Sequence, residues 1–168
     1  MPKIIENLKD RLLEEAQRQI EECGYEAVTI RSIAKGCGVG IGTVYNYFPS
    51  KETLVAKHLL IDWNTCMGQI QTVAERATDP QPVAQCIYCQ LADFADRHAA
   101  IFRNEAAMSG FAGSFGQYHG VLRGQLAVPL AKFCRDDFSS QFIAESLLVW
   151  TMEGKSFDEI YDILEKLF

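Results

Sequence analysis

The sequence predicts an all-α protein of about nine helices, and two observations carry that prediction. Apolar residues recur every three or four positions along most of the chain, the spacing that places them on one face of a helix. Alternating β-branched runs and Asn-Gly or Asp-Gly hairpin turns do not occur, so nothing in the sequence indicates a strand. The 168 residues, 48% of them hydrophobic, can bury the cores of one or two small domains.

The first helix and the fourth have clear ends. We expect the first over residues 4–23, because Gly24 supplies a stop after it. Ser50 is a suitable N-cap for a helix that continues to about residue 77, before the Thr-Asp-Pro-Gln-Pro break at 78–82. Five further helices are expected at residues 82–98, 99–109, 115–135, 139–152 and 156–167. In the last of these, Ser156 is the N-cap and Glu159 completes a capping box.

Residues 29–54 predict two short helices joined by a glycine turn. On the first helix four apolar residues share one face: Ile30, Ile33, Ala34 and Cys37. Gly38 supplies the left-handed C-cap that a tight turn needs. The second helix begins near residue 41 and buries Val44 and Phe48, which lie four residues apart. Its other side carries residues suited to the DNA major groove: Thr43, Tyr45, Asn46 and Tyr47. Helices and turn in this order make a helix-turn-helix motif.

The net charge of −6 argues at first against a nucleic-acid partner, but the acidic residues are unevenly placed. Residues 1–58 hold eight Lys and Arg against eight Asp and Glu, while the other 110 residues hold eight against fourteen. Within residues 29–58 four basic side chains stand against one acidic side chain, a local balance of +3. The basic charge therefore coincides with the helix-turn-helix segment.

Over residues 5–58 the chain resembles the TetR family of bacterial transcriptional regulators. The matching segments are Thr29-Ile30-Arg31, Ile33-Ala34, Gly38-Val39, Gly42-Thr43-Val44-Tyr45-Asn46-Tyr47-Phe48 and Ser50-Lys51-Glu52-Thr53-Leu54. The resemblance implies a helix-turn-helix DNA-binding domain at residues 1–58. It also implies a helical ligand-binding and dimerisation domain at residues 59–168.

Carried over position by position, the resemblance implies that residues 41–47 form the recognition helix. Thr43 and Tyr45 then face base edges and thymine methyl groups, and Asn46 pairs with an adenine or a phosphate. Tyr47 and Lys51 are expected to hold phosphates, Lys51 from the start of the following helix.

Other positions are expected to support the contact with DNA. Thr29 caps the second helix and reaches the DNA backbone. Arg31 enters the groove edge, or else forms a solvated salt bridge. Gly42 lets the recognition helix approach the DNA closely, and Ile41 either joins the core or touches a thymine methyl.

Two glycines depart from the family's pattern, and an interior glycine costs about 1 kcal/mol relative to alanine. They are Gly36 and Gly40.

An effector pocket is expected in the second domain, because aromatic and methionine side chains accept apolar ligands and nearby glycines let helices shift. One wall is expected from Phe102, Met108, Phe111, Phe115 and Tyr118, and the facing wall from Trp63, Met67 and Ile70. The alternative is an ordinary core with a flexible helix connection. The last two predicted helices are apolar on more than one face, which agrees with the dimerisation through final helices that the resemblance implies.

The six cysteines lie within apolar helical patterns and not at the loop positions of a disulfide scaffold. We expect Cys86 and Cys89 to be buried core residues. Cys86 and Cys89 are three apart on one helix face, which leaves a thiol sensor as an alternative. A structural zinc site needs four ligands, and no second pair has suitable spacing, so no metal and no cofactor are expected. The start of the chain lacks the apolar segment of a signal peptide, and no apolar run approaches 18 residues, so we expect a reduced, cytoplasmic location.

The function predicted from these observations is a DNA-binding transcriptional regulator. We expect a homodimeric repressor that binds a palindromic operator and is released by a small apolar or aromatic effector. A ligand-independent DNA-binding protein and a cysteine-based redox regulator are the alternatives. No nucleophile–base pair or phosphate-binding loop stands out, so we do not expect an enzyme. The operator, the effector and the regulated genes are not specified by the sequence.

Overall fold

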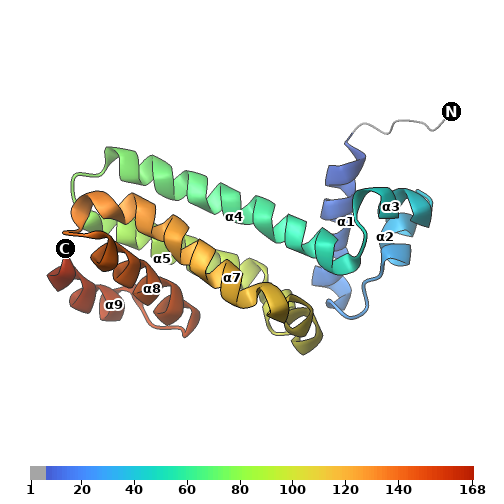
Figure 1. The fold of residues 1–168 in the computed structure, drawn as a ribbon. Helices are drawn as coiled ribbons and strands as arrows, with labels where there is room; N and C mark the ends of the chain where they lie inside the picture. The colour runs from blue at the N-terminus through green and yellow to red at the C-terminus, as the bar shows by residue number, and fades with distance from the viewer. Residues whose placement is uncertain (1–6) are drawn as a thin grey trace. The chain divides into compact units, whose positions relative to one another are not determined.

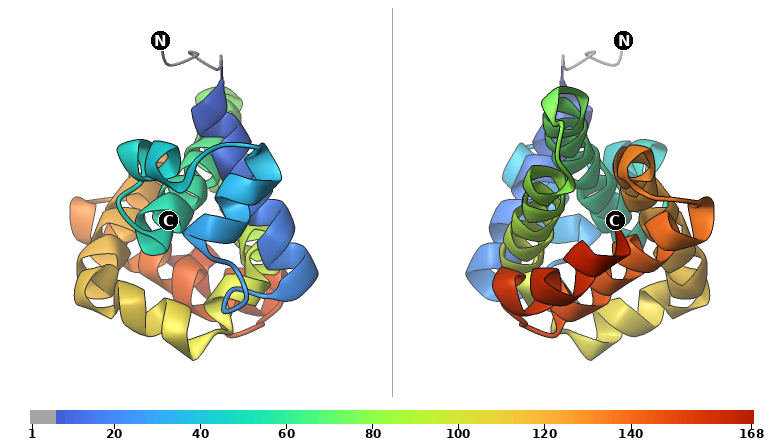
Figure 2. Two further views of the ribbon diagram at one scale, coloured as in Figure 1. Left: turned by 90° about the vertical axis from the view of Figure 1, so that its right-hand side faces the viewer. Right: turned by 90° about the vertical axis from the view of Figure 1, so that its left-hand side faces the viewer.

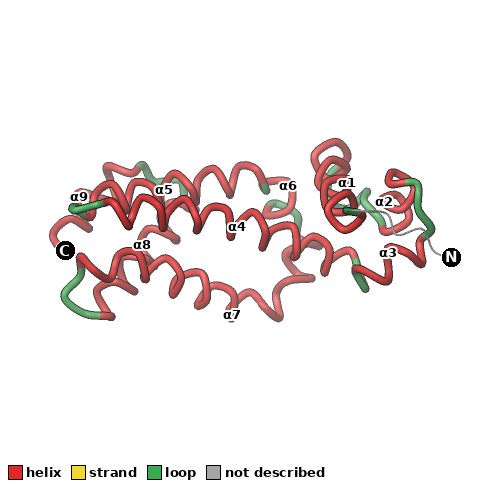
Figure 3. The backbone as a smooth tube through the Cα atoms, turned by 90° about the horizontal axis from the view of Figure 1, so that it is seen from above, coloured by secondary structure: helices red, strands yellow, loops and turns green. Residues whose placement is uncertain are grey.

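The computed structural model describes residues 7–168, with the side chains of residues 110–118 left out of the description. The described residues form helices and loops without any strand (Figure 3), which confirms the predicted all-α class. The α-helices are α1 (Leu8–Cys23), α2 (Ile30–Cys37), α3 (Ile41–Tyr47), α4 (Lys51–Arg76), α5 (Pro80–Arg97), α6 (Ala99–Phe102), α7 (Glu105–Leu130), α8 (Asp137–Met152) and α9 (Phe157–Leu164), shown in Figure 1. Short 3₁₀ turns follow α7 and α9, at Ala131–Phe133 and Glu165–Leu167.

The chain divides into two compact units, each with its own core. The first contains the described residues up to Ile61 together with His98–Gly113, and the second contains Asp62–Arg97 and Ser114–Phe168. Helices α4 and α7 therefore contribute residues to both units. The segment that begins at His98 is distant in sequence from the helix-turn-helix residues, yet it belongs to the same unit.

The first unit is built on the apolar stripe of α1. Five residues of that stripe are buried at helical spacing: Leu8, Leu12, Leu13, Ala16 and Ile20. They pack with the buried face of α2 and with two residues of the distant segment, Ile101 and Ala107. Asn104 Nδ2 also donates to Glu26 Oε1, at 3.3 Å, which links this segment to the loop after α1.

The second unit packs α5 against α8 and α9, as the right-hand view of Figure 2 shows. The core residues that α5 supplies recur at helical spacing: Val83, Ala84, Ile87 and Leu91. Three residues of α4 join the same core: Trp63, Ile70 and Ala74. Trp63 donates from Nε1 to Gln125 Oε1 on α7, at 2.6 Å, so its indole N–H is satisfied although the ring is buried.

Helix boundaries in the second half differ from the sequence-based expectation. The helix predicted at 99–109 is wrong, because α6 ends at Phe102 and Asn104 starts a new helix by accepting from Ala107 N at 2.9 Å. The break predicted before residue 115 is also wrong, since α7 runs through residues 110–114. Each glycine there costs a helix only about 1 kcal/mol. That helix ends at Leu130 and not at residue 135, directly after Pro129, which has no N–H to donate.

The remaining boundaries agree to within a few residues. Helix α5 begins at Pro80, two residues before the predicted start, where Asp79 Oδ1 accepts from Gln81 N at 2.8 Å. Helix α8 likewise begins at Asp137, capped by Asp136, whose Oδ1 accepts from Ser139 N at 2.7 Å. The predicted capping box at the start of α9 is confirmed. The start predicted for the first helix, at residues 4–6, lies outside the described residues.

Candidate nucleic-acid interface

The N-terminus of α2 is closed by a reciprocal capping box. Thr29 Oγ1 accepts from Ser32 N, and Ser32 Oγ accepts from Thr29 N, both at 3.0 Å. The predicted role of Thr29 as a cap is therefore confirmed. The role of Ser32 was missed, although a hydroxyl three residues after a threonine could have indicated it.

The turn between α2 and α3 has the predicted geometry. Gly38 takes φ +67°, the left-handed region that favours glycine, and a Cβ there would be strained. Val39 N donates to Ala34 O at 2.9 Å, which closes the end of α2. Helix α3 then begins at Ile41, after Gly40, whose extended backbone acts as an N-cap without a side-chain acceptor.

Helix α3 is anchored on one side and open on the other. Val44 is fully buried and Phe48 is 2% exposed, which confirms the predicted inner face. Tyr45 is 52% exposed and Tyr47 is 45% exposed. Two aromatic side chains this exposed on a seven-residue helix are unusual for a surface that only meets water.

Smaller residues complete the outer face of α3. Asn46 and Gly42 are exposed, and a Cβ added at Gly42 would meet open space. Thr43 is half-buried. Ile41 is also half-buried and packs against the core of the first unit, which favours the core alternative for its side chain.

Lys51 has a partner within the protein. Its Nζ donates to Tyr25 O at 3.0 Å and lies 4.0 Å from the centre of the Tyr25 ring. This contact ties the start of α4 to the loop between α1 and α2, and nothing in the sequence pointed to it. Burial, together with the nearby Glu52 carboxylate, raises the pKa of Tyr25 to about 12, so the ring stays neutral under the cation.

Two basic residues of α2 are exposed, whereas a basic residue of α1 has a structural role. Arg31 and Lys35 are exposed, and within the described part of the chain Arg31 forms no ion pair, so its salt-bridge alternative is not realised. Arg11 is different, because its Nη2 donates to Cys37 O at 3.1 Å and so caps the C-terminus of α2.

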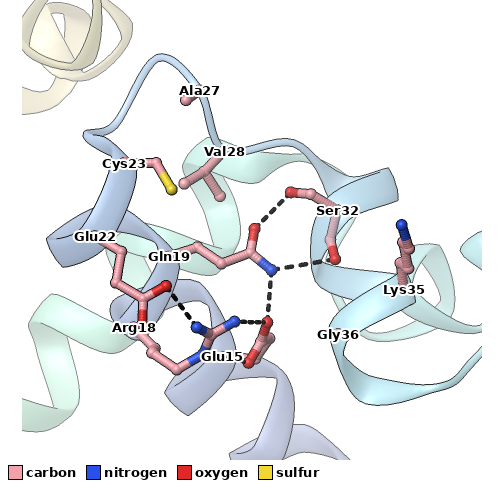
Figure 4. Close-up of a pocket in the computed structure, with 10 residues that line it drawn as sticks. All are labelled: Glu15, Arg18, Gln19, Glu22, Cys23, Ala27, Val28, Ser32, Lys35 and Gly36. Carbon is pink, nitrogen blue, oxygen red and sulfur yellow. Dashed lines mark hydrogen bonds and ion pairs between the residues drawn. The ribbon is translucent and has the colours of Figure 1, made fainter.

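Gly36, which departs from the family's pattern, has a structural reason. A Cβ at this position would overlap the carboxylate of Glu15, which lies against the α2 backbone from α1. Glu15 accepts from Arg18 Nη2 at 2.7 Å and from Gln19 Nε2 at 2.6 Å (Figure 4). These hydrogen bonds, that of Arg18 first, hold the pKa of Glu15 below its ordinary value. These residues belong to the wall of a surface pocket of about 440 Å³ between α1 and α2.

The predicted effector pocket is only partly described. Trp63 and Ile70 are buried in the second core and Met67 packs against it, while Phe102 and Met108 are half-buried residues of the first unit. The other three predicted residues lie among residues 110–118, whose side chains are outside the description: Phe111, Phe115 and Tyr118. The effector pocket therefore stays a prediction.

The cysteines lie in several environments. The expectation of burial is wrong for Cys89, which is exposed because α5 buries the face defined by Ile87 and Leu91. Burial raises the pKa of the Cys86 thiol, and the neighbouring Cys89 adds to the rise, which disfavours the reactive thiolate. Among the described residues no group of three or more His, Cys, Asp or Glu could hold a metal ion.

An apolar groove lies on α8 and α9, at the place where surplus apolar residues were expected. Its most exposed members are Phe142 and Trp150, each 48% exposed, and Ile163, 66% exposed. The groove has a volume of about 440 Å³, and Lys155 and Glu159 lie at its polar edge, 3.4 Å apart. In the described part of the chain no helix is long and apolar enough to cross a membrane.

Comparison with known proteins points to one group. The family described as "Bacterial regulatory proteins, tetR family" matches residues 12–57. The HTH-type transcriptional repressor KstR2 of Mycolicibacterium smegmatis is 31% identical over 103 residues, which are 58% of this chain and 49% of that repressor. The chain thus spans about half the length of the curated relatives it matches.

Solved structures share the fold. The transcriptional regulator SCO7518 of Streptomyces coelicolor A3(2) aligns with a TM-score of 0.74 at 14% identity, over 96% of this chain and 98% of that one. A TetR-family transcriptional regulator from Streptomyces coelicolor aligns with a TM-score of 0.64 at 15% identity, over 95% and 99% of the two chains. These proteins, like KstR2, are described as transcriptional regulators and not as enzymes.

Proposed function

We propose that the chain is a transcriptional repressor of the TetR family, which its residues 12–57 match, and that it binds a palindromic operator as a homodimer. A small effector releases it from the operator. Residues 1–58 bind DNA in this proposal, and residues 59–168 carry effector binding and dimerisation. A regulator of chromosomal genes acts in the cytoplasm, where the DNA is.

The outer face of α3 is the observation that carries the proposal. Tyr45 and Tyr47 stand half-exposed on a short helix whose inner side is fixed by Val44 and Phe48. A helix fixed in this way holds its outer residues at constant positions, which base recognition in the major groove requires. Gly42 leaves open space beside them, so the backbone of α3 can approach the base edges.

Phosphate contacts would come from the surroundings of α3. Arg31 and Tyr47 are exposed, so each can turn toward a phosphate. Lys51 already binds the Tyr25 carbonyl, and a phosphate would take another of the three ammonium hydrogens. We propose that Lys51 both fixes the α1–α2 loop and contributes positive charge.

The groove on α8 and α9 supports the homodimer. Phe142, Trp150 and Ile163 expose large apolar side chains around one groove, and clustered apolar surface of this kind often marks a protein–protein interface. A two-fold axis through these helices makes the same surface pair with itself. The two recognition helices of such a dimer would enter successive major grooves about 34–36 Å apart.

The effector is proposed to be apolar or aromatic. Trp63 contacts Phe94 edge to face, with ring centres 5.7 Å apart, so aromatic side chains lie together where α4 and α5 meet in the second unit. An effector acts only if it binds the DNA-free state more tightly than the DNA-bound state. If no apolar or aromatic compound releases the protein from DNA, the ligand-independent alternative is favoured.

The DNA-binding proposal is tested by selection of a duplex and by substitution. The wild-type protein is incubated with duplexes of randomised sequence, and the enriched sequence is used to measure affinity at fixed salt. Tyr45→Ala should weaken binding roughly tenfold to a hundredfold, the loss expected for one good base contact. Val121→Ala, at an exposed residue of α7, is the control and should bind as wild type. Enrichment of no sequence, or wild-type affinity in Tyr45→Ala, would overturn the proposal.

A further inference from the structure

Gln19 joins α1 to the N-terminal turn of α2 through its side-chain amide. Its Oε1 accepts from Ser32 Oγ at 2.6 Å. Its Nε2 donates to Ser32 O at 3.1 Å and to Glu15 Oε1 at 2.6 Å. Figure 4 shows the amide lying between Ser32 on one side and Glu15 on the other. One residue of α1 therefore holds both the side chain and the backbone of a residue in the first turn of α2.

The Glu15 carboxylate fixes the direction of these hydrogen bonds. An ionised carboxylate only accepts, and so does a backbone carbonyl, so the amide must turn its NH₂ toward Glu15 and Ser32 O. The amide oxygen of Gln19 then faces the Ser32 hydroxyl and can only accept from it. The lowered pKa of Glu15 keeps the carboxylate ionised near neutral pH.

The direction of hydrogen-bond donation set by Glu15 extends through Ser32 to Thr29. The Ser32 hydroxyl has one proton, and the acceptor at 2.6 Å on Gln19 is nearer than Thr29 O at 2.9 Å. Its lone pairs are then free to accept from Thr29 N at 3.0 Å. Thr29 Oγ1 in turn accepts from Ser32 N, and among the described residues its own hydroxyl proton meets no acceptor. That proton is available to an acceptor outside the protein.

We infer that Gln19 is a positioning residue for the DNA-backbone contact at the N-terminus of α2. This inference rests on the proposed function and deepens it. Gln19 holds Ser32 in the rotamer that completes the capping box, and the box fixes the Thr29 hydroxyl and the first-turn N–H groups of α2. A phosphate is the acceptor that suits this end, because hydroxyl and helix N-terminal N–H groups both donate to anions.

A purely structural role would make Gln19 one more contact between α1 and α2, independent of Thr29. The two roles differ in how substitutions combine. If Gln19 acts through Thr29, the loss of Gln19 has no further effect on DNA affinity once Thr29 has lost its hydroxyl. If Gln19 only stabilises the domain, the two losses add.

The test is a double-mutant cycle with Gln19→Leu and Thr29→Val, measured on the duplex selected by the wild-type protein, at fixed salt and well below the melting temperature. Leucine keeps the bulk of the side chain and removes all three hydrogen bonds. Gln19→Leu should weaken binding roughly threefold to tenfold, the effect of one or two lost hydrogen bonds. The double variant should bind as Thr29→Val does, and Thr29→Ser, which keeps the hydroxyl, should bind close to wild type.

Gln17→Leu is the matched control, because the Gln17 amide donates to Glu21 Oε1 on its own helix, at 2.5 Å. It should leave both DNA affinity and the Thr29 amide unchanged. Hydrogen exchange of the Thr29 amide in free protein gives a second measurement, which should be roughly threefold to tenfold faster in Gln19→Leu.

Three results would overturn the inference. They are wild-type affinity in Gln19→Leu, additive losses in the double variant, and unchanged exchange of the Thr29 amide. If the wild-type protein selects no duplex at all, the proposed function fails and this inference fails with it. If the wild-type protein binds but Gln19→Leu has no effect, this inference alone fails.

Discussion

Replacement of Gly36 by alanine should destabilise the protein, against the usual preference of helices for alanine. The residue lies in the last turn of α2, and a Cβ there would overlap the Glu15 carboxylate. Glu15 is the flexible end of a side chain, so it can swing away. In doing so it leaves the Gln19 amide, to which it is bound at 2.6 Å.

Two opposing contributions decide the magnitude. Alanine in place of glycine stabilises a helix by at most about 1 kcal/mol, and less near its end. A hydrogen bond to a charged group contributes about 1.5–3 kcal/mol, and we take about 2 kcal/mol because the Glu15 side chain is only 14% exposed. Half of the Arg18 side chain is exposed, so Arg18 can follow the moving carboxylate. Its ion pair with Glu15 therefore does not contribute to the difference in the free energy of unfolding between wild type and Gly36→Ala. The net loss for Gly36→Ala is then about 1 kcal/mol.

Urea unfolding at fixed protein concentration measures this loss. The same Gly36→Ala replacement made in a protein without the Glu15 carboxylate provides the comparison. In the Glu15→Ala protein the methyl group that Gly36→Ala introduces has no carboxylate to displace, so the same replacement should stabilise the fold by up to about 1 kcal/mol. The sign of the effect should therefore reverse between the two backgrounds. Stabilisation of equal size in both proteins would mean that the contact of Glu15 with α2 contributes nothing to stability, contrary to this prediction.

Three further outcomes are expected. Because the folded-state pKa of Glu15 is lowered, its carboxylate stabilises the fold above the ordinary pKa of 4.5, and this contribution is lost as the pH falls through the lowered value. The stability difference between wild type and Glu15→Gln should thus shrink in urea titrations below pH 4.5, and a constant difference would contradict this. Lys51→Met removes the bond to Tyr25 O and should cost about 1 kcal/mol in thermal unfolding, which an unchanged melting temperature would disprove. With a thiol reagent at neutral pH the exposed Cys89 should react well before the buried Cys66, whose pKa is raised by burial, and the reverse order would contradict the described environments.

The helix-turn-helix segment could be predicted from sequence because its signals are local. Gly38 needs a positive φ, Thr29 needs an N–H three residues on, and Val44 and Phe48 lie one helical turn apart. Each of these requirements involves neighbours within four residues. Tyr45 could be placed on the outer face for the same reason, since the buried face of the helix fixes the opposite one.

Contacts between distant residues could not be predicted in this way. Nothing in a spacing pattern indicates that Glu15 covers Gly36, or that Lys51 binds the carbonyl of Tyr25. The assignment of His98–Gly113 to the first unit depends on packing between segments far apart in the chain. The continuity of α7 was missed because glycines count against a helix locally, whereas packing along its length decides whether it forms.

A footprint of the protein on its selected duplex would show whether a dimer reads DNA with the outer face of α3. Such a dimer should protect two major-groove patches whose centres lie about one helical turn apart, related by the two-fold symmetry of the DNA sequence. In Tyr45→Ala the base-specific protection should weaken in both patches together. A single unpaired patch, protection confined to the minor groove, or a footprint that Tyr45→Ala leaves intact would contradict a dimer that reads DNA with the outer face of α3.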